Sequence, residues 1–252
     1  MELGGRVAIV TGAAAGTGRA IALRLAREGA TVVVADVARE VGEETVRLVE
    51  AAGGRAGFVR ADVRVDSDVA RMVVAAVEGY GRLDVLVNNA GGGGHVEPHF
   101  PQADVQDWGA TLDLNLRGAM LATQLALEPM RRRGEGAVVN VASTAGLGFA
   151  PYASPEYGAA KAGLIRFTST LVGLREEMGV RVNCVVPDWI LTERAQEELQ
   201  RMSPAERAAA PTPLSLDDVA DAVVALIADD DLAGRVMVLR GGEARRLLDP
   251  VE

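Results

Sequence analysis

Tyr157 and Lys161 stand four residues apart in the stretch SPEYGAAKAGL (154–164), and Lys161 is the only lysine in the chain. On a helix this spacing places both side chains on one face. A free tyrosine titrates near pH ~10, and lowering its pKa by roughly three requires about 4 kcal/mol of stabilisation of the phenolate. A nearby ammonium supplies such stabilisation, and the planar fork of arginine suits carboxylates instead. The pair predicts a tyrosine acid/base assisted by lysine; the alternative is an ordinary lysine on a helix surface.

Two further polar residues are candidates for the same site. Ser143 follows the apolar run GAVVNVA (136–142), where a hydroxyl can hold a carbonyl or carbinol oxygen and stabilise charge on it. Asn115 lies inside a helical pattern at about 103–133, although asparagine is a poor helix former. It is either a tolerated polar residue or a helix distortion whose freed carbonyl holds a water beside Lys161. The alternative for Ser143 is an ordinary turn residue without a catalytic role.

The stretch TGAAAGTG (11–18) places three glycines between a predicted strand and a predicted helix. A pyrophosphate must approach backbone N–H groups at a helix N-terminus without a Cβ in the way, which explains glycine at positions 12, 16 and 18. A tight strand–helix turn without a ligand is the alternative. The context of strand, loop and helix favours dinucleotide binding.

Asp36 ends the second predicted strand, 18 residues after Gly18. A carboxylate at this place accepts hydrogen bonds from the hydroxyls of an adenosine ribose and repels a 2′-phosphate. Ala15 and Val37 supply no positive charge that would offset this repulsion, and Arg39 is interpreted as a surface helix residue. The sequence therefore favours NAD over NADP. Asp62, at the end of the third predicted strand, either caps the adenine or begins a turn.

Short β-branched runs alternate with longer helical patterns along the whole chain. This alternation predicts right-handed crossovers and a parallel sheet covered on both faces, with the ligand beyond the carboxyl ends of the strands. We therefore expect one α/β domain, 1–252, with a Rossmann-like, doubly wound, three-layer αβα fold of about seven strands. The strands are predicted at 6–11, 31–36, 56–62, 84–89, 136–142, 181–187 and 235–239, and the helices at 17–28, 39–52, 67–79, 103–133, 155–178 and 216–228.

Composition restricts the partners. The net charge of −9 offers no footprint for nucleic acid or an anionic membrane, and Arg131–Arg133 is interpreted as the charged end of a surface helix. No apolar run reaches the ~18 residues of a membrane span, and no signal-peptide pattern precedes the first strand. A single cysteine, Cys184, excludes an internal disulfide and fits a reducing cytoplasm.

In these motifs the chain resembles the short-chain dehydrogenase/reductase family over essentially its whole length. TGAAAGTG resembles the family's T-G-x-x-x-G-x-G cofactor loop, with Thr17 where isoleucine is usual. NNAG (88–91) resembles the element that steadies the sheet and lines the cofactor site. The resemblance implies an NAD-dependent oxidoreductase that transfers a hydride between a secondary alcohol or ketone and nicotinamide.

The resemblance also implies a role for each catalytic candidate. Tyr157 is the acid/base, and Ser143 orients the substrate oxygen. Lys161 lowers the tyrosine pKa and binds the nicotinamide ribose, and Asn115 anchors a proton-relay water. The implied cofactor contacts are Gly12, Ala15, Gly16, Thr17, Gly18, Asp36, Asp62, Val63, Asn89, Ala90, Gly91, Tyr157, Lys161, Pro187, Ile190 and Thr192.

The chain departs from the family pattern at two places after the sixth predicted strand. Asp188 follows Pro187 where the family usually has glycine, and its carboxylate would favour the cationic oxidised ring if it faces the nicotinamide; a solvent-facing carboxylate is the alternative. Arg240 stands where aspartate before Gly-Gly is common, which leaves subunit packing near the terminus less defined. A homotetramer or homodimer is expected, with the patterns at 103–133 and 155–178 pairing across a two-fold axis.

The substrate lid is expected at about 188–213, with further contributions from 91–102 and 147–156. Phe149, Tyr152 and Trp189 fall in these segments and suggest an apolar or cyclic alcohol or ketone, although lid aromatics also serve as packing. His95 and His99 are interpreted as loop residues rather than metal ligands, because the segment is glycine-rich and shows no third ligand. No metal is expected.

Two other functions remain compatible with this fold. One is a noncatalytic NAD-sensing or scaffold protein, which the complete set of catalytic candidates argues against. The other is epimerisation or dehydration of a nucleotide sugar, which usually needs an added substrate domain, and 252 residues leave little room for one.

Overall fold

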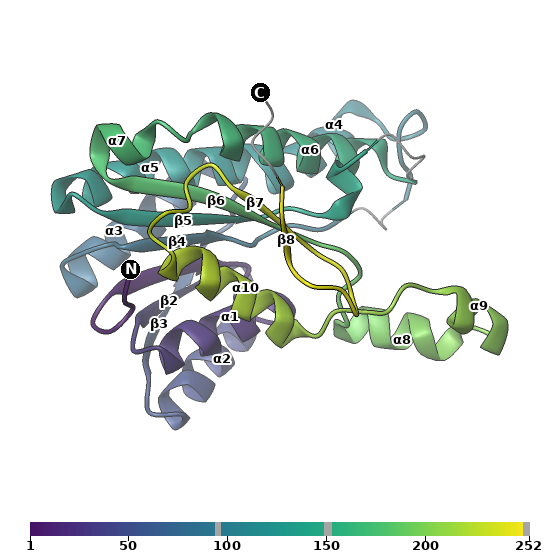
Figure 1. Ribbon diagram of the computed structural model, residues 1–252, viewed down its shortest axis with the longest axis horizontal. Coiled ribbons are helices and arrows are strands. Elements are labelled where there is room, and N and C mark those ends of the chain that lie inside the picture. The colour runs from purple at the N-terminus through teal and green to yellow at the C-terminus, as the bar shows by residue number, and fades with distance from the viewer. Residues whose placement is uncertain (94–96, 149–152, 249–252) are drawn as a thin grey trace.

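A computed structural model describes residues 1–93, 97–148 and 153–248 (Figure 1). Within these ranges the strands form one sheet in the order β3-β2-β1-β4-β5-β6-β7-β8, in which only the β7–β8 pair is antiparallel. The strands are β1 (Val7–Thr11), β2 (Thr31–Asp36), β3 (Arg55–Arg60), β4 (Val85–Asn88), β5 (Gly136–Val141), β6 (Val180–Pro187), β7 (Val236–Leu239) and β8 (Arg246–Leu247). Strands β1, β4, β5, β6 and β7 are buried along their whole length, as expected for a parallel sheet covered on both faces.

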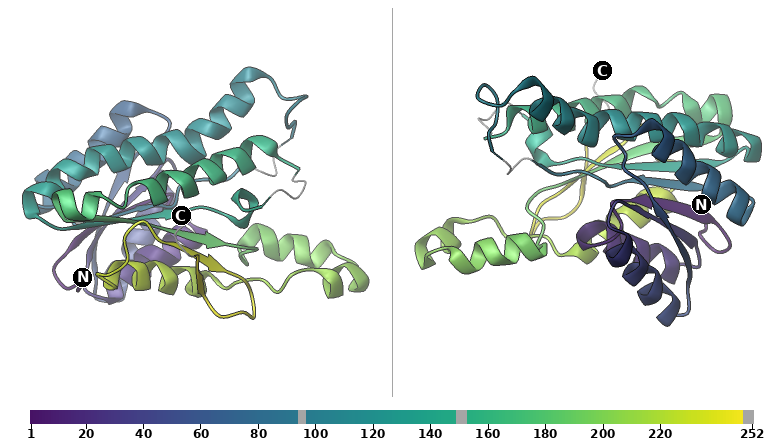
Figure 2. Two further views of the ribbon diagram at one scale, coloured as in Figure 1. Left: turned by 45° about the horizontal axis from the view of Figure 1, so that its top comes forward. Right: turned by 180° about the vertical axis from the view of Figure 1, so that it is seen from behind.

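Helices cover both faces of the sheet, α1, α2 and α10 on one side and α3, α5 and α6 on the other (Figures 1 and 2). One apolar core packs the first face against Ile21, Leu25 and Leu226, and a second packs the opposite face against Met72 and Met130. The doubly wound three-layer prediction is confirmed. The helices are α1 (Gly16–Arg27), α2 (Arg39–Ala51), α3 (Asp66–Tyr80), α4 (Val105–Leu112), α5 (Gly118–Arg133), α6 (Pro155–Thr170), α7 (Leu174–Met178), α8 (Glu193–Arg201), α9 (Pro204–Ala209) and α10 (Leu216–Ala228).

The structure corrects several predicted boundaries. The sheet has an eighth strand, because Arg246–Leu247 pairs with β7, and a two-residue strand leaves no periodic pattern in the sequence. The pattern at 103–133 is α4 and α5 joined by a π-helical turn at Asp113–Arg117. The pattern at 155–178 is likewise divided into α6 and α7. The third strand ends at Arg60, so Asp62 lies in the following turn.

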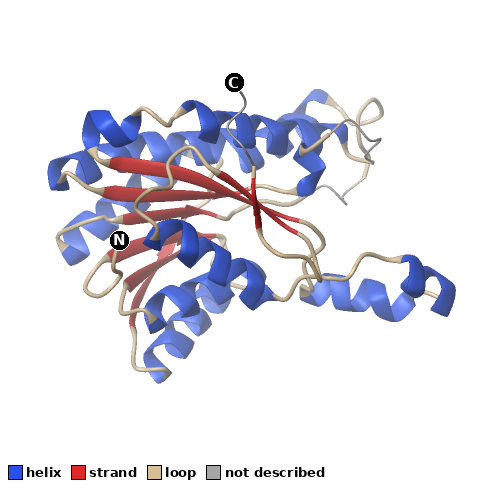
Figure 3. Cartoon of the chain, viewed as in Figure 1, coloured by secondary structure: helices blue, strands red, loops and turns tan. Residues whose placement is uncertain are grey.

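The order of the strands reverses between β1 and β4, so the loops after these two strands diverge at the carboxyl edge of the sheet. Such a switch point is where doubly wound sheets bind ligands. The glycine loop follows β1, and the segment NNAG begins at the end of β4. Figure 3 shows the strands converging toward this edge between the helical layers.

Helices α8 and α9 form the predicted lid segment and project from the body of the molecule beyond this edge (Figures 1 and 2). None of the helices in the described ranges has the length and apolar character that crossing a membrane requires. Phe149, Tyr152 and His95 lie outside the described residues.

Candidate active site

The glycine loop is shaped by close backbone approach. Gly12 has φ +64°, a left-handed conformation that favours glycine, and a Cβ at Gly18 would lie 2.6 Å from Asn89 Nδ2 and collide with the Gly12 carbonyl. Helix α1 begins at Gly16 directly after this loop. Its first N–H groups therefore face a space that side chains leave open, which is the arrangement that binds a phosphate.

Asn89 joins the loops after β1 and β4. Its side-chain amide donates to the carbonyl oxygens of Thr11 at 2.9 Å and Gly12 at 3.2 Å. The Thr11 hydroxyl accepts in return from the N–H groups of Asn89 and Ala90, both at 3.0 Å. These bonds hold the glycine loop at the switch point, so Asn89 and Ala90 have a structural task there.

The Asp36 carboxylate is half-buried at the end of β2. It accepts hydrogen bonds from the N–H of Ala14 at 2.9 Å and from the N–H of Ala38 at 3.0 Å. Arg39 pairs with Glu43 at 3.0 Å and lies over the Phe58 ring, which agrees with its interpretation as a surface helix residue. The negative charge of Asp36 therefore stands beside the glycine loop.

Asp62 begins the turn after β3. Its carboxylate accepts from the backbone and guanidinium N–H groups of Arg64, and these hydrogen bonds hold its pKa below the ordinary value despite the opposing effect of burial. Val63 packs its backbone against Gly118 at the start of α5. Neither residue lines the cavity beside the glycine loop, so their predicted cofactor contacts stay predictions.

Helix α6 presents Tyr157 and Lys161 on the same face. Pro155 occupies the first turn, after Ser154 at the N-cap, which sets the start of the helix two residues before Tyr157. The Lys161 Nζ lies 5.6 Å from the centre of the Tyr157 ring and donates to the Val141 carbonyl at 3.0 Å. Lys161 is 3% exposed, so the interpretation of it as a surface lysine is wrong.

Burial lowers the pKa of Lys161 from 10.5 to about 8. The ammonium form therefore still predominates at neutral pH. Burial also raises the pKa of the neighbouring Cys184 thiol to about 12, so this side chain remains neutral beside the lysine. The positive charge of Lys161 is therefore not neutralised by Cys184. It lies beside Tyr157 and faces the cavity that starts at the glycine loop.

Asn115 lies in the π-helical turn Asp113–Arg117 and is buried. Its amide donates to the carbonyls of Gly92 at 2.8 Å and Thr111 at 2.9 Å, and its Oδ1 accepts from the Gly92 N–H at 2.9 Å. A Cβ on Gly91 would lie 2.8 Å from the Asn115 Oδ1 and 3.0 Å from the Lys161 Nζ. Glycine at position 91 thus allows these two polar atoms to approach the same point. Of the two interpretations of Asn115, the helix distortion is the one that is present.

Ser143 caps the short 3₁₀ turn Thr144–Gly146 that follows β5, and its Oγ accepts from the Ala145 N–H at 3.2 Å. A Cβ on Gly146 would lie 2.6 Å from the Ala162 nitrogen on α6. The turn therefore packs directly on the helix that carries Tyr157. This contact brings Ser143 and Tyr157 to the wall of one cavity.

Two cavities meet at Tyr157. The first, about 290 Å³, runs from the glycine loop to Tyr157 and Lys161; among the predicted residues it is lined by Gly12, Ala15, Thr17, Gly18, Asn89, Gly91, Tyr157, Lys161, Pro187, Ile190 and Thr192. The second, about 350 Å³, is lined by Ser143 and Tyr157 together with Thr144, Asp188, Trp189 and Arg194. Tyr157, Pro187, Ile190 and Thr192 line both cavities. The structure therefore joins the groove beside the glycine loop to the pocket of Ser143 at the tyrosine.

The structure shows two contacts at the site that sequence reasoning did not find. The Asp188 Oδ1 accepts from the Thr144 hydroxyl at 2.9 Å, so this carboxylate belongs to the wall of the second cavity. Whether it also acts on a nicotinamide ring stays a prediction. Glu156, beside Tyr157, accepts from Ser154 at 2.8 Å and contacts the His99 ring nitrogen at 2.7 Å. The contacts of Asp188 with Thr144 and of Glu156 with His99 join segments that are distant in sequence, and no local pattern reports them.

Comparison with known proteins agrees with the site. The family profile described as short chain dehydrogenase matches residues 6–203. The chain is similar to cis-4-hydroxycyclohexanecarboxylate dehydrogenase of Sinomonas cyclohexanicum, 37% identical over 94% of this chain and 96% of that protein. It is also similar to cyclopentanol dehydrogenase of Comamonas sp. (strain NCIMB 9872), 34% identical over 94% of this chain and 96% of that protein.

Among solved structures, the fold is similar to hydroxysteroid dehydrogenase from Escherichia coli, with a TM-score of 0.83 and 28% identity over 96% of this chain and 98% of that chain. The family match covers most of the sequence, and its residues include the glycine loop and the Tyr157–Lys161 pair. The chain belongs to the short-chain dehydrogenase/reductase family of oxidoreductases, whose members use nicotinamide cofactors.

Proposed function

We propose that this protein is an NAD-dependent oxidoreductase that transfers a hydride between a secondary alcohol or ketone and nicotinamide, with Tyr157 as the acid/base. The observation that carries this proposal is the position of Tyr157 at the junction of the two cavities, beside Lys161 on one side and Ser143 on the other. A tyrosine in this place can reach both a cofactor and a substrate oxygen.

The residues fit a nicotinamide dinucleotide. The glycine loop leaves the N-terminus of α1 open to a pyrophosphate, and the close packing at Gly18 excludes any side chain there. Asp36 would hold the adenosine ribose, Lys161 the nicotinamide ribose, and Thr192 the carboxamide. When bound, the nicotinamide supplies the carbon that accepts or gives the hydride.

In the direction of oxidation, Ser143 holds the carbinol oxygen and Tyr157 takes its proton while the hydride leaves the carbinol carbon. The Lys161 ammonium favours the phenolate that accepts this proton. Asn115 fixes the segment around Gly92, and a water held by the π-helical turn would return the proton to solvent. In the reverse direction Tyr157 gives the proton to the ketone oxygen.

The preference for NAD is supported by the charges around Asp36. The carboxylate repels a 2′-phosphate, and the two arginines near it are engaged elsewhere. Arg39 is paired with Glu43, and the guanidinium of Arg19 donates to the Ala14 carbonyl and the Thr45 hydroxyl. Accepting NADP would require breaking one of these contacts to bring a positive charge to the phosphate.

We infer a cyclic secondary alcohol, or the corresponding ketone, as the substrate class. Trp189 and Ile190 give the second cavity an apolar wall beside the polar end formed by Ser143 and Tyr157. The two curated relatives named above are dehydrogenases of ring alcohols by name. Their similarity supports the same reaction class for this chain.

We further propose that the protein works in the cytoplasm as a homodimer or homotetramer. The one cysteine, Cys184, is buried and free, which is compatible with a reducing compartment. Helices α5 and α6 form an apolar groove on the outer face, where Met120 is 41% exposed. Pairing of this face with a second copy would cover it.

The experiment that tests the proposed function measures absorbance at the reduced-nicotinamide band. The purified protein is given a panel of secondary alcohols, steroids, sugars and hydroxy acids, each with NAD⁺ and with NADP⁺. We expect turnover with NAD⁺ and a loss of about 10²- to 10⁴-fold in Tyr157→Phe. Tyr80→Phe is the matched control, because Tyr80 lies on α3 and packs near Gly57, away from both cavities.

Three outcomes separate the alternatives. Turnover with NADP⁺ alone would contradict the role of Asp36. Full activity of Tyr157→Phe would contradict the role of the tyrosine. Binding of NADH without turnover of any compound would favour a noncatalytic NAD sensor on the same fold.

A further inference from the structure

An arginine, Arg194, lines the second cavity. Arg194 is the second residue of α8, is exposed, and lines the cavity together with Ser143 and Tyr157. Among the described residues, none forms a hydrogen bond or ion pair with its guanidinium. The neighbouring lid arginines differ, because Arg201 pairs with Glu197 at 3.4 Å and Arg207 donates to the Leu199 carbonyl at 2.9 Å.

Arg194 lines only one of the two cavities that meet at Tyr157. It does not line the cavity that starts at the glycine loop, although its neighbour Thr192 lines both cavities. An anion recognised by Arg194 would therefore lie in the pocket of Ser143, on the substrate side of Tyr157. The guanidinium fork matches both carboxylate and phosphate geometry with two parallel hydrogen bonds, and the small volume of the pocket, about 350 Å³, favours the smaller carboxylate.

The other charge of this pocket does not cancel that of Arg194. The Asp188 Oδ1 is occupied by the Thr144 hydroxyl at 2.9 Å, and no ion pair joins Asp188 to Arg194 within the described part of the chain. Trp189 and Ile190 provide apolar surface between the polar groups of the wall. The cavity of about 350 Å³ is at the small end of ligand pockets, which suits a compact molecule with one reacting oxygen and one anionic group.

We propose that the substrate is a hydroxy acid or the corresponding keto acid, and that Arg194 determines this specificity by binding its carboxylate. The proposal rests on the proposed dehydrogenase function and defines its substrate class. Ser143 and Tyr157 hold the oxygen of the reacting carbon, and Arg194 holds the carboxylate at a distance set by the intervening carbon skeleton. No atom of Arg194 takes part in the hydride or proton transfer.

The test compares acids with their uncharged amides. Initial rates with NAD⁺ are measured for 4-hydroxycyclohexanecarboxylate against its carboxamide, and for 3-hydroxybutyrate against 3-hydroxybutyramide. We expect kcat/KM for at least one acid to exceed that of its amide by about tenfold or more, and the ratio to fall as salt is added. In Arg194→Ala the ratio should fall toward 1, and Arg194→Lys should restore part of it, because a lysine keeps the charge without the fork.

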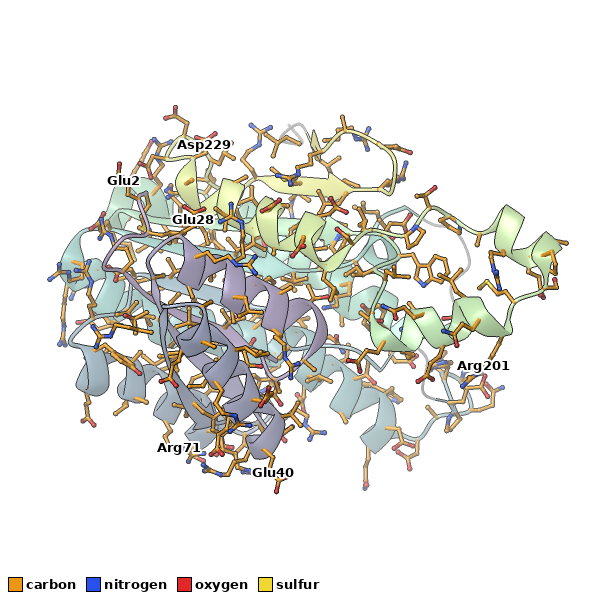
Figure 4. All side chains as sticks on the ribbon, turned by 90° about the horizontal axis from the view of Figure 1, so that it is seen from below. Glu2, Glu28, Glu40, Arg71, Arg201 and Asp229 are labelled. Atoms are coloured by element: carbon orange, nitrogen blue, oxygen red, sulfur yellow. The ribbon has the colours of Figure 1, made fainter. Side chains whose placement is uncertain are left out.

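Arg201→Ala is the matched control. Arg201 is on the same helix, its side chain is 80% exposed and paired with Glu197, and Figure 4 shows it at the end of α8 on the projecting lid. It should keep the wild-type ratio of acid to amide. An amide preferred by the wild type, or a ratio that Arg194→Ala leaves unchanged, would overturn the proposal while the dehydrogenase function still stood.

A binding measurement tests the same residue without turnover. Benzoate and benzamide are titrated into the NADH complex, followed by nicotinamide fluorescence. We expect benzoate to bind about tenfold or more tightly than benzamide in the wild type and to lose this advantage in Arg194→Ala. Equal binding of the two compounds in the wild type would overturn the proposal. A different result would contradict the proposed function itself, namely that no alcohol of the panel is turned over in a reaction that depends on Tyr157.

Discussion

At the scale of single residues, the burial of Lys161 places a charge beside Tyr157 but lowers the stability of the fold. Its ammonium is held in a buried place, with the Val141 carbonyl as a hydrogen-bond acceptor, and burial lowers its pKa from 10.5 to about 8. The unfolded chain therefore binds more protons than the folded chain between about pH 8 and pH 10.5. At neutral pH the buried ammonium of Lys161 lowers the free energy of unfolding. This penalty decreases as the pH rises from about 8 to about 10.5.

Replacing the buried ammonium should stabilise the protein and abolish its chemistry. The fall in pKa from 10.5 to about 8 corresponds to about 3 kcal/mol, and losing the bond to Val141 offsets part of it. We expect Lys161→Met to have the higher free energy of unfolding at pH 7, measured with denaturant and no dinucleotide, and little oxidoreductase activity. The difference from the wild type should shrink between pH 8 and pH 10.5.

Arg166→Met is the control for this prediction, because Arg166 is an exposed basic residue on the same helix. It should change stability little at any of these pH values. A Lys161→Met protein that is less stable at pH 7, or a difference that does not depend on pH, would show that the lysine is not held at the expense of stability.

The catalytic candidates could be predicted from sequence because local spacing reports them. Tyr157 and Lys161 share a helix face at four residues apart, and Ser143 follows a strand whose carboxyl end reaches the same edge of the sheet. Arg194 and the contact between Asp188 and Thr144 could not be predicted in this way. They depend on where the lid and two separate loops meet, which no short pattern encodes.

At the scale of elements, the π-helical turn at Asp113–Arg117 explains why asparagine is placed in a helix. The Asn115 side-chain amide donates to the carbonyls of Thr111 and Gly92, and its oxygen accepts from the Gly92 N–H. These bonds join the end of α4 to the loop after β4, where the Asn115 Oδ1 and the Lys161 Nζ approach the same point beside Gly91. The sequence offered the distortion as one of two interpretations of Asn115, and the π-helical turn decides between them. The exact break between α4 and α5 could not be predicted, because it depends on the contact with Gly92.

Glu156 joins the segment around His99 and Phe100 to α6, the helix that carries Tyr157. Its side chain is 7% exposed and accepts from Ser154 and from the Phe100 N–H at 3.4 Å, and it contacts His99 at 2.7 Å. Burial raises the pKa of Glu156, but these hydrogen bonds outweigh burial and leave the pKa below its ordinary value. The stabilisation is therefore present above the pKa of the unfolded chain and is lost as the pH falls through the folded value.

We expect Glu156→Gln to release the segment around Phe100 from α6. Amide hydrogen exchange at residues 97–103 should become faster, and the free energy of unfolding should fall by about 1 to 3 kcal/mol at neutral pH. The loss should become smaller at acid pH, where the wild-type carboxyl is protonated. Glu97→Gln is the control, because Glu97 is exposed in the same segment. Equal exchange rates in both variants would show that Glu156 does not hold this segment on α6.

Element boundaries were predictable where apolar patterns are strong. The buried strands β1, β2 and β5 were placed within one residue of their ends, because their continuous β-branched runs stop at polar or glycine residues. The lid helices α8 and α9 were predicted only as a lid segment. Their charged sequence, such as ERAQEELQR in α8, has no apolar stripe that marks a helix packed on a core.

At the scale of the whole molecule, a chain of buried amides and hydroxyls connects the layers beneath the site. Asn88 on β4 donates to Asn140 on β5 at 2.8 Å, and Asn140 donates to Thr168 on α6 at 2.9 Å. Asn88 also donates to Thr123 on α5 at 3.0 Å. The helix that carries Tyr157 is thus bonded to the strands that carry the cofactor loops, so the two halves of the site keep a fixed relation.

The proposed assembly is also a property of the whole molecule. If α5 and α6 pair with a second copy, Met120→Glu should place a charge in the covered groove and lower the mass in solution toward that of one 26.3 kDa chain. Light scattering after gel filtration measures this, with two or four chains expected for the wild type. Val74→Glu is the control, because Val74 is 47% exposed on α3; a loss of mass in the control alone would place the interface elsewhere.

The central claim, hydride transfer governed by Tyr157, is tested most directly with an alcohol deuterated at its carbinol carbon. The alcohol with the highest rate in the panel is oxidised with NAD⁺, and the reduced dinucleotide is analysed by mass spectrometry and NMR. We predict one deuterium at C4 of the nicotinamide ring with the wild type, and a rate lower by about 10²- to 10⁴-fold with Tyr157→Phe. Deuterium that appears in the solvent instead, or transfer at the wild-type rate by Tyr157→Phe, would contradict the account.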